Sequence, residues 1–124
     1  MGRPITHFEI ASPNLESATE FYRQLFDWSV GEELIDGYRL VQTAEGSIGG
    51  GLLRTPQGVF PYVTIYVSVA DLRASLDKAE ELGGKTVVEP MPIPGVGTFA
   101  MFQDPDGVMI GALRGEYAAS ATMT

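Results

Sequence analysis

The 124-residue sequence has no cysteine, one histidine and few basic residues, and each scarcity removes classes of function. Without cysteine, disulfides, zinc–thiolate sites and thiol nucleophiles are excluded. Eight lysine and arginine residues against sixteen acidic ones give a formal net charge of −8, which argues against a nucleic-acid partner because phosphate binding needs a basic surface. No apolar run approaches the ~20 residues that span a bilayer, and no signal-peptide pattern opens the chain. We therefore expect no membrane partner and a cytoplasmic location.

The composition and length of the sequence are typical of a globular domain. Apolar residues make up 44% of the sequence and charged residues 19%. The length suits one domain over residues 1–124, large enough to bury a core. The small and polar residues of 115–124 predict a flexible tail.

Two helices are predicted from apolar residues at helical spacing. One follows the N-cap candidate Asn14 in "NLESATEFYRQLF", and the other follows Asp71 in "DLRASLDKAEELGG", where two glycines end it. The two segments align without a gap at an offset of 57 residues. The alternating strands that precede them, "ITHFEIAS" and "YVTIYVSV", align at the same offset.

Three candidate strands follow each helix, so the chain repeats itself. They are residues 28–34, 38–43 and 47–54 after the first helix, and 85–91, 98–103 and 108–114 after the second. The sequence thus predicts an α+β fold of two tandem βαβββ modules, residues 4–54 and 62–114. We expect the duplicated modules to share a continuous mixed sheet.

The quoted motifs resemble a known family. "HFEIASPNLESATEFYRQLFDW" and "YVTIYVSVADLRASLDKAEELGGK", closed by "MFQDPDGVMIGAL", are similar to the glyoxalase/bleomycin resistance/dioxygenase superfamily, also called vicinal oxygen chelate (VOC) proteins. The resemblance covers about residues 4–114. It implies a sheet that curls around a cup-shaped cavity, commonly within a homodimer.

The resemblance also implies where a metal would bind. Metalloenzymes of the family hold one divalent ion with four side chains, at positions that match His7 and Thr64 on the first strands, and Gly51 (or Gly50) and Gly111 on the last strands. A metal-binding relative would carry glutamate at position 111. Because a divalent ion needs three or four nitrogen or oxygen ligands, we expect no metal and no cofactor. Lyase, dioxygenase and epimerase activities are then all in doubt.

Strand alternation assigns side chains to the predicted cavity wall. His7 and Glu9 share one face of the first strand, and Thr64 and Tyr66 match them in the repeat. The lining candidates from the later strands are Tyr38, Leu40, Gly51, Phe99, Met101, Met109 and Gly111. Such a wall, apolar and aromatic with a few polar groups, suits a small hydrophobic or aromatic ligand.

Two features of this wall have alternative interpretations. His7 is either a polar side chain held by a hydrogen bond or, with Glu9 beside it, a ligand-binding group or general base. Gly51 and Gly111 either leave room for a ligand or mark a bend in the sheet. If they leave open room, Gly111→Glu should fold with a loss of about 1 kcal/mol.

Three functional hypotheses follow. The first is a metal-independent small-molecule-binding protein of this superfamily, acting as a homodimer. The second is a metal-free enzyme in which His7, with Glu9 or Tyr66, supplies the acid and base. The third is a glyoxalase-like or dioxygenase-like enzyme whose divalent metal has other ligands. Binding and proton transfer would use the same side chains, so the first two hypotheses share one set of residues.

Overall fold

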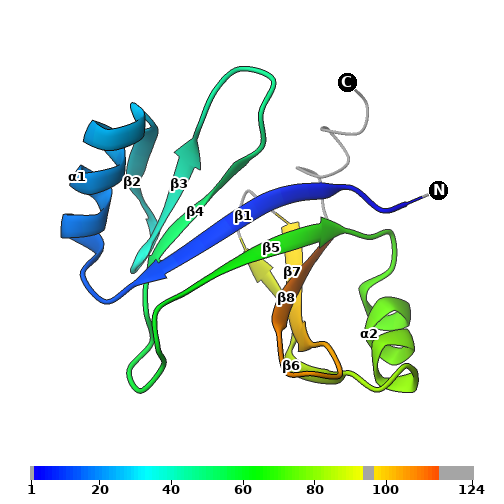
Figure 1. Ribbon diagram of the computed structural model, residues 1–124. Helices are drawn as coiled ribbons and strands as arrows, with labels where there is room; N and C mark the ends of the chain where they lie inside the picture. Colours follow the sequence, from blue (N-terminus) through cyan, green and yellow to red (C-terminus); the bar gives the residue numbers. More distant parts are fainter. Residues whose placement is uncertain (1, 94–96, 115–124) are drawn as a thin grey trace. The chain divides into compact units, whose positions relative to one another are not determined.

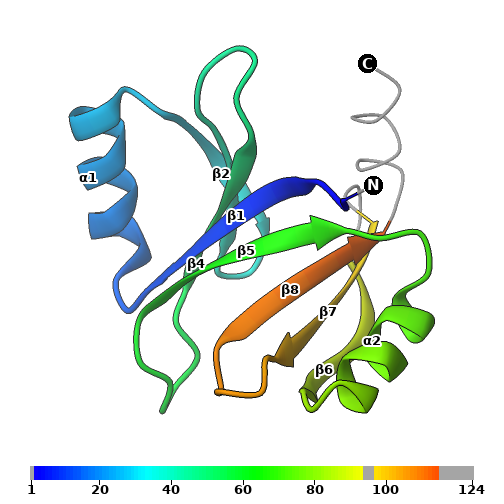
Figure 2. The same cartoon turned by 45° about the vertical axis from the view of Figure 1, so that its right-hand side comes forward.

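The computed structural model describes residues 2–93 and 97–114, which form two α-helices and eight β-strands (Figures 1 and 2). In chain order they are β1 (Ile5–Ser12), α1 (Leu15–Phe26), β2 (Ser29–Ile35), β3 (Tyr38–Gln42), β4 (Gly49–Arg54), β5 (Tyr62–Ser68), α2 (Leu72–Glu81), β6 (Lys85–Ile93), β7 (Gly97–Gln103) and β8 (Met109–Arg114). The predicted α+β class and the repeated βαβββ order are confirmed. The tail predicted for 115–124 lies outside the described residues.

The chain divides into two compact units. The N-terminal unit is residues 7–64, and the described part of the C-terminal unit is residues 2–6, 65–93 and 97–114. The N-terminal unit has the strand order β2-β3-β4-β1 and also holds residues 62–64 of β5. The C-terminal unit has the order β5-β8-β7-β6, with β5 from residue 65 onward. In each unit the first strand pairs in parallel with the last, and the other pairs are antiparallel. The two units therefore repeat one topology.

Both helices begin at the residues that the sequence predicts. The side chain of Asn14 accepts a hydrogen bond from the backbone N–H of Ser17 at 3.0 Å, and Asp71 does the same for Ala74 at 3.0 Å. These bonds satisfy backbone donors that a helix N-terminus leaves unpaired. Neither helix in the described part of the chain is long and apolar enough to cross a membrane.

Each helix packs on one face of its own sheet. Beneath α1 the buried core consists of Leu15, Ala18, Val30, Val41 and Leu52, with Phe8, Ile10, Tyr22 and Trp28 packed against it. Beneath α2 the corresponding core is Leu72, Leu76, Ala100 and Ala112. Because side chains alternate along a strand, each sheet has a second face, turned away from its helix.

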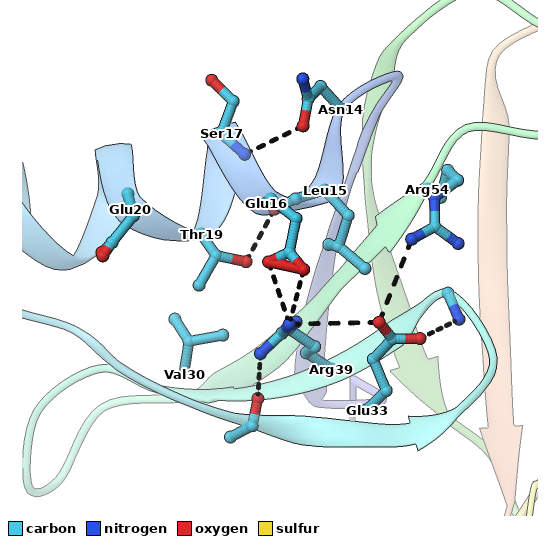
Figure 3. Close-up of polar contacts among 12 residues, drawn as sticks. Asn14, Leu15, Glu16, Ser17, Thr19, Glu20, Val30, Glu33, Arg39 and Arg54 are labelled. Carbon is cyan, nitrogen blue, oxygen red and sulfur yellow. Dashed lines mark hydrogen bonds and ion pairs between the residues drawn. The ribbon is translucent and has the colours of Figure 1, made fainter.

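Arg39 connects α1 to the strands of the N-terminal unit through a hydrogen bond and ion pairs (Figure 3). From β3, its guanidinium donates to the carbonyl of Gly31 at 3.0 Å and lies 3.2 Å from a carboxylate oxygen of Glu16 on α1. Its side chain is 13% exposed, and its guanidinium also lies 4.0 Å from the carboxylate of Glu33 on β2. This arrangement holds α1 on one face of the sheet and leaves the opposite face for other contacts.

Candidate functional site

The sheet face opposite α1 carries the predicted polar residues of β1. Phe8 and Ile10 belong to the core beneath α1, so by alternation His7 and Glu9 lie on the other face. Both are buried, with 5% and 4% of their surface exposed. A buried carboxylate or imidazole is costly unless it is hydrogen-bonded, so we expect hydrogen-bond partners beside both side chains.

Two tyrosine hydroxyls connect these residues into one polar cluster, defined here as His7, Glu9, Tyr38 and Tyr62. His7 Nε2 lies 2.9 Å from the hydroxyl oxygen of Tyr38. The carboxylate of Glu9 accepts hydrogen bonds from the hydroxyls of Tyr38 and Tyr62. A carboxylate can only accept, so the Tyr38 proton is directed to Glu9 and its oxygen accepts from the Nε2–H of His7.

Burial and the charge of Glu9 shift the titration of the cluster. Burial lowers the pKa of His7 from 6.5 to about 4, which keeps the imidazole neutral near neutral pH. Burial, followed by the negative charge of Glu9 and the hydrogen bond to it, raises the pKa of Tyr38 well above its usual value. The same causes raise the pKa of Tyr62 to about 12. Both hydroxyls therefore keep their protons and act as donors.

Gly51 allows Tyr38 to reach this position. In the sheet Gly51 pairs with Glu9 on β1 and with Leu40 on β3. A Cβ at position 51 would collide with the hydroxyl and ring of Tyr38, so the ring occupies the space that glycine leaves. The interpretation that Gly51 leaves open room is thus corrected: the room is filled by a tyrosine ring, which brings its hydroxyl to His7 and Glu9.

The C-terminal unit places a different tyrosine over its matching glycine. Tyr66 pairs with Gly111 across β5 and β8, and a Cβ at position 111 would collide with the ring of Tyr66. The Tyr66 hydroxyl lies 3.9 Å from the sulfur of Met101, in a cluster with buried Leu113. The space over Gly111 is therefore filled core, so the condition for a cost of only about 1 kcal/mol is not met and we expect Gly111→Glu to cost more.

The predicted site residues fall into two groups. In the N-terminal unit, His7, Glu9 and Tyr38 come together over Gly51; Thr64 is buried in the same unit, and Leu40 is 38% exposed. In the C-terminal unit, Tyr66, Phe99, Met101 and Met109 form an apolar cluster on the face that carries Gly111. The predicted set omits Tyr62, although alternation with Thr64 along "YVTIYVSV" could have identified it.

The residues at the family's metal positions do not fit a divalent ion. Gly50, Gly51 and Gly111 have no donor side chain, and each lies beneath an aromatic ring. Thr64 offers a hydroxyl, and Nε2 of His7 is hydrogen-bonded to Tyr38. Within residues 2–93 and 97–114, no three His, Cys, Asp or Glu side chains form a group that could hold a metal. We therefore derive no chemical step through a metal ion.

Two curated relatives match the chain by sequence. "Putative glyoxylase CFP32" of Mycobacterium tuberculosis is 34% identical over 77 residues, which cover 62% of this chain and 30% of that protein. "Anthracycline biosynthesis protein DnrV" of Streptomyces peucetius is 26% identical over 135 aligned positions, covering 94% of this chain and 49% of that protein. The chain thus spans less than half the length of these relatives.

Solved structures share the fold at lower identity. Methylmalonyl-CoA epimerase of Streptomyces coelicolor, in complex with 2-nitronate-propionyl-CoA, matches with a TM-score of 0.68 and 20% identity over 93% of this chain and 98% of its own. At that identity the likeness shows the fold alone. The family profile that matches residues 4–111 covers both βαβββ repeats almost completely. This chain belongs to the Glyoxalase/Bleomycin resistance protein/Dioxygenase superfamily.

Proposed function

We propose that this chain is a metal-independent small-molecule-binding protein that takes a small hydrophobic or aromatic ligand at the polar cluster of the N-terminal unit. One observation carries the proposal: a carboxylate, an imidazole and two tyrosine hydroxyls are gathered on a sheet face that the same fold fills with apolar side chains elsewhere in the chain. Buried polar groups of this kind are costly, and ligand binding is a reason to keep them.

The repeat supports this argument residue by residue. Glu9 pairs with Gly51 across the parallel strands of the N-terminal unit, and Tyr66 pairs with Gly111 across those of the C-terminal unit. The two pairs occupy equivalent places, yet Tyr66 belongs to an apolar cluster with Met101. The topology therefore does not require a carboxylate at the position of Glu9.

The surroundings of the cluster favour a ligand with an aromatic or hydrophobic body. The rings of Tyr38 and Tyr62 supply apolar surface beside their hydroxyls, and Leu40, 38% exposed, follows Tyr38 on the same face of β3. Thr64 stays a predicted ligand contact of the N-terminal unit.

A metal-free acid–base enzyme is the second candidate, because His7, Tyr38 and Glu9 form a continuous chain of hydrogen bonds. A lowered pKa makes the imidazole of His7 a weak base near neutral pH. This candidate therefore depends on Glu9 and the tyrosine hydroxyls more than on His7. Turnover of any compound that binds, measured by product analysis, separates the two candidates.

The binding proposal is tested with a pair of matched tyrosine variants. Tyr38→Phe removes the central hydroxyl of the cluster, whereas Tyr22→Phe removes a hydroxyl from α1 on the other side of the sheet. Ligand-observed NMR against a panel of small aromatic amines, alcohols and carboxylates should find a saturable ligand for the parent protein. We expect Tyr38→Phe to weaken that ligand by about tenfold or more and Tyr22→Phe to leave it unchanged. No binding by any compound, or equal binding by both variants, would overturn the proposal.

Metal independence has its own test. Elemental analysis of protein purified without chelators should find no stoichiometric Zn, Ni, Fe or Mn. About one ion per chain, lost in His7→Ala, would contradict the proposal and revive the metalloenzyme hypothesis.

We also propose that the protein is a homodimer, because strands at the sheet edges leave backbone groups that a partner can cover. Sedimentation at tens of micromolar should give twice the 13.3 kDa mass of the chain. A species of the single-chain mass alone would contradict this.

A further inference from the structure

We infer that the polar cluster selects ligands by charge: it takes an aromatic compound that donates a hydrogen bond, prefers a cationic donor such as an ammonium group, and rejects carboxylates. The inference rests on the proposed function and names the ligand class of the same site.

The hydrogen bonds of the cluster converge on a negative group. Glu9 is the acidic member, and Tyr38 and Tyr62 both direct their hydroxyl protons toward it. Burial and then the negative charge of Glu9 raise the pKa of both hydroxyls, so both stay protonated, and a ligand beside them would meet the negative potential of the carboxylate. Burial strengthens such a potential because little water screens it.

The arginines of the N-terminal unit are engaged elsewhere. Arg39 alternates with Tyr38 along β3, so it lies on the face of α1, where it contacts Glu16. Arg23 on α1 donates to the carbonyl of Val30 at 2.7 Å. Arg54 lies within 4.0 Å of the carboxylates of Glu33 and Asp36. These contacts bind the three guanidinium groups to partners outside the cluster.

The charge of the whole unit adds to the effect. Residues 7–64 contain three arginines and no lysine, against the acidic side chains Glu9, Glu16, Glu20, Asp27, Glu32, Glu33, Asp36 and Glu45. An approaching anion therefore meets repulsion from the unit at long range and from Glu9 at close range. A cation meets attraction from both, and its N–H groups can donate to a carboxylate in a charge-assisted hydrogen bond.

Three ligands with one aromatic ring system test this selection. They are 1-naphthylmethylamine, which is cationic at pH 7.5, 1-naphthylmethanol, which is a neutral donor, and 1-naphthylacetate, which is anionic. Calorimetric titration of the parent protein should give affinities in that order, with the amine at least about 100-fold tighter than the carboxylate. Glu9→Gln keeps the shape of the side chain and removes its charge, so it should reduce the difference between amine and carboxylate to about threefold. Glu45→Gln removes an exposed charge between β3 and β4 of the same unit and should preserve the order.

The outcomes separate this inference from the proposed function. Equal affinities, or a carboxylate that binds tightest, would overturn the charge selection while the binding function stands. Binding of none of the three, with no other ligand in the aromatic panel, would overturn both. The order of the three affinities in the parent protein decides the inference even if Glu9→Gln fails to fold, because that order needs no variant.

Discussion

The N-terminal and C-terminal units share one topology but differ in the sheet face that is turned away from the helix. In the N-terminal unit the face turned away from α1 carries the polar cluster of His7, Glu9, Tyr38 and Tyr62. In the C-terminal unit the equivalent face is apolar, with Tyr66, Met101 and Leu113 buried together. Each unit also sets a glycine of its last strand beneath a tyrosine ring.

The difference shows which features belong to the fold and which do not. A glycine beneath an aromatic ring occurs in both units, although the ring comes from β3 in one and from β5 in the other. Among the residues that the structure describes, a buried carboxylate and a buried imidazole occur in the N-terminal unit only. Packing explains the shared feature, and we propose ligand binding as the reason for the unshared one.

The largest expected effect is a loss of stability in mild acid that comes from the N-terminal unit. The pKa of His7 is lowered from 6.5 to about 4 in the folded protein. As pH falls below 6.5, the imidazole is therefore protonated in the unfolded chain but stays neutral in the folded chain until pH approaches 4. The free energy of unfolding is therefore highest above about pH 7, and the titration of His7 lowers it by about 3 kcal/mol between about pH 6.5 and 4. Thr64, the repeat partner of His7, has no such titration. Urea unfolding from pH 4 to 7.5 should show this loss in the parent and not in His7→Gln, and parallel profiles would contradict it.

The next largest expected effect is the loss of stability when either of the two glycines beneath a tyrosine ring is replaced. Gly51→Ala and Gly111→Ala should each cost about 2 kcal/mol, because each Cβ displaces a buried tyrosine ring. Displacing Tyr38 also breaks its hydrogen bond with His7, so Tyr38→Phe should reduce the cost of Gly51→Ala. Tyr66→Phe should not reduce the cost of Gly111→Ala, because ring carbons make the closest contacts there. Double-mutant cycles measure both couplings, and equal couplings would contradict the assignment.

The smallest expected effect concerns the two arginines whose ion pairs connect each helix to its strands. Arg39 is 13% exposed and links β3 with α1, whereas Arg73 on α2 is 54% exposed and pairs with Glu89. Arg39→Met should lower the free energy of unfolding by about 1 kcal/mol, because its hydrogen bond to Gly31 and its ion pair with Glu16 are lost. Arg73→Met should change stability by no more than the error of the measurement. Equal losses in thermal unfolding would show that burial does not distinguish the two arginines.

Most of the fold is predictable from the sequence because its signals are local. Asn14 and Asp71 mark both helix starts through their side chains, and alternation gives β1 its bounds. The predicted end of β6 differs, since the strand continues past Met91 through Pro92 to Ile93. Proline suggests a break, but β6 ends the strand order of its unit, and an edge strand tolerates a residue without an N–H.

The candidate site is predictable only in part because its contacts are not local. His7 and Glu9 share a face by alternation alone, which is a property of two neighbouring positions. Tyr38 reaches these two residues only because β3 pairs with β4. Tyr62 joins the cluster through a contact with Glu9, which lies 53 residues earlier in the chain. Nothing in the sequence near Gly51 or Gly111 indicates that a ring from another strand covers it.

The most direct test of the central claim is the unfolding free energy of a variant whose polar cluster is made apolar. His7→Leu, Glu9→Met and Tyr38→Phe combined imitate the apolar face of the C-terminal unit at similar side-chain volume. If the cluster serves ligand binding, urea unfolding at pH 7 should show this triple variant to be at least as stable as the parent, because buried charged networks are often less stabilising than apolar replacements. A loss of more than about 2 kcal/mol would mean that the cluster is part of the packing that holds the unit together, and it would contradict the claim.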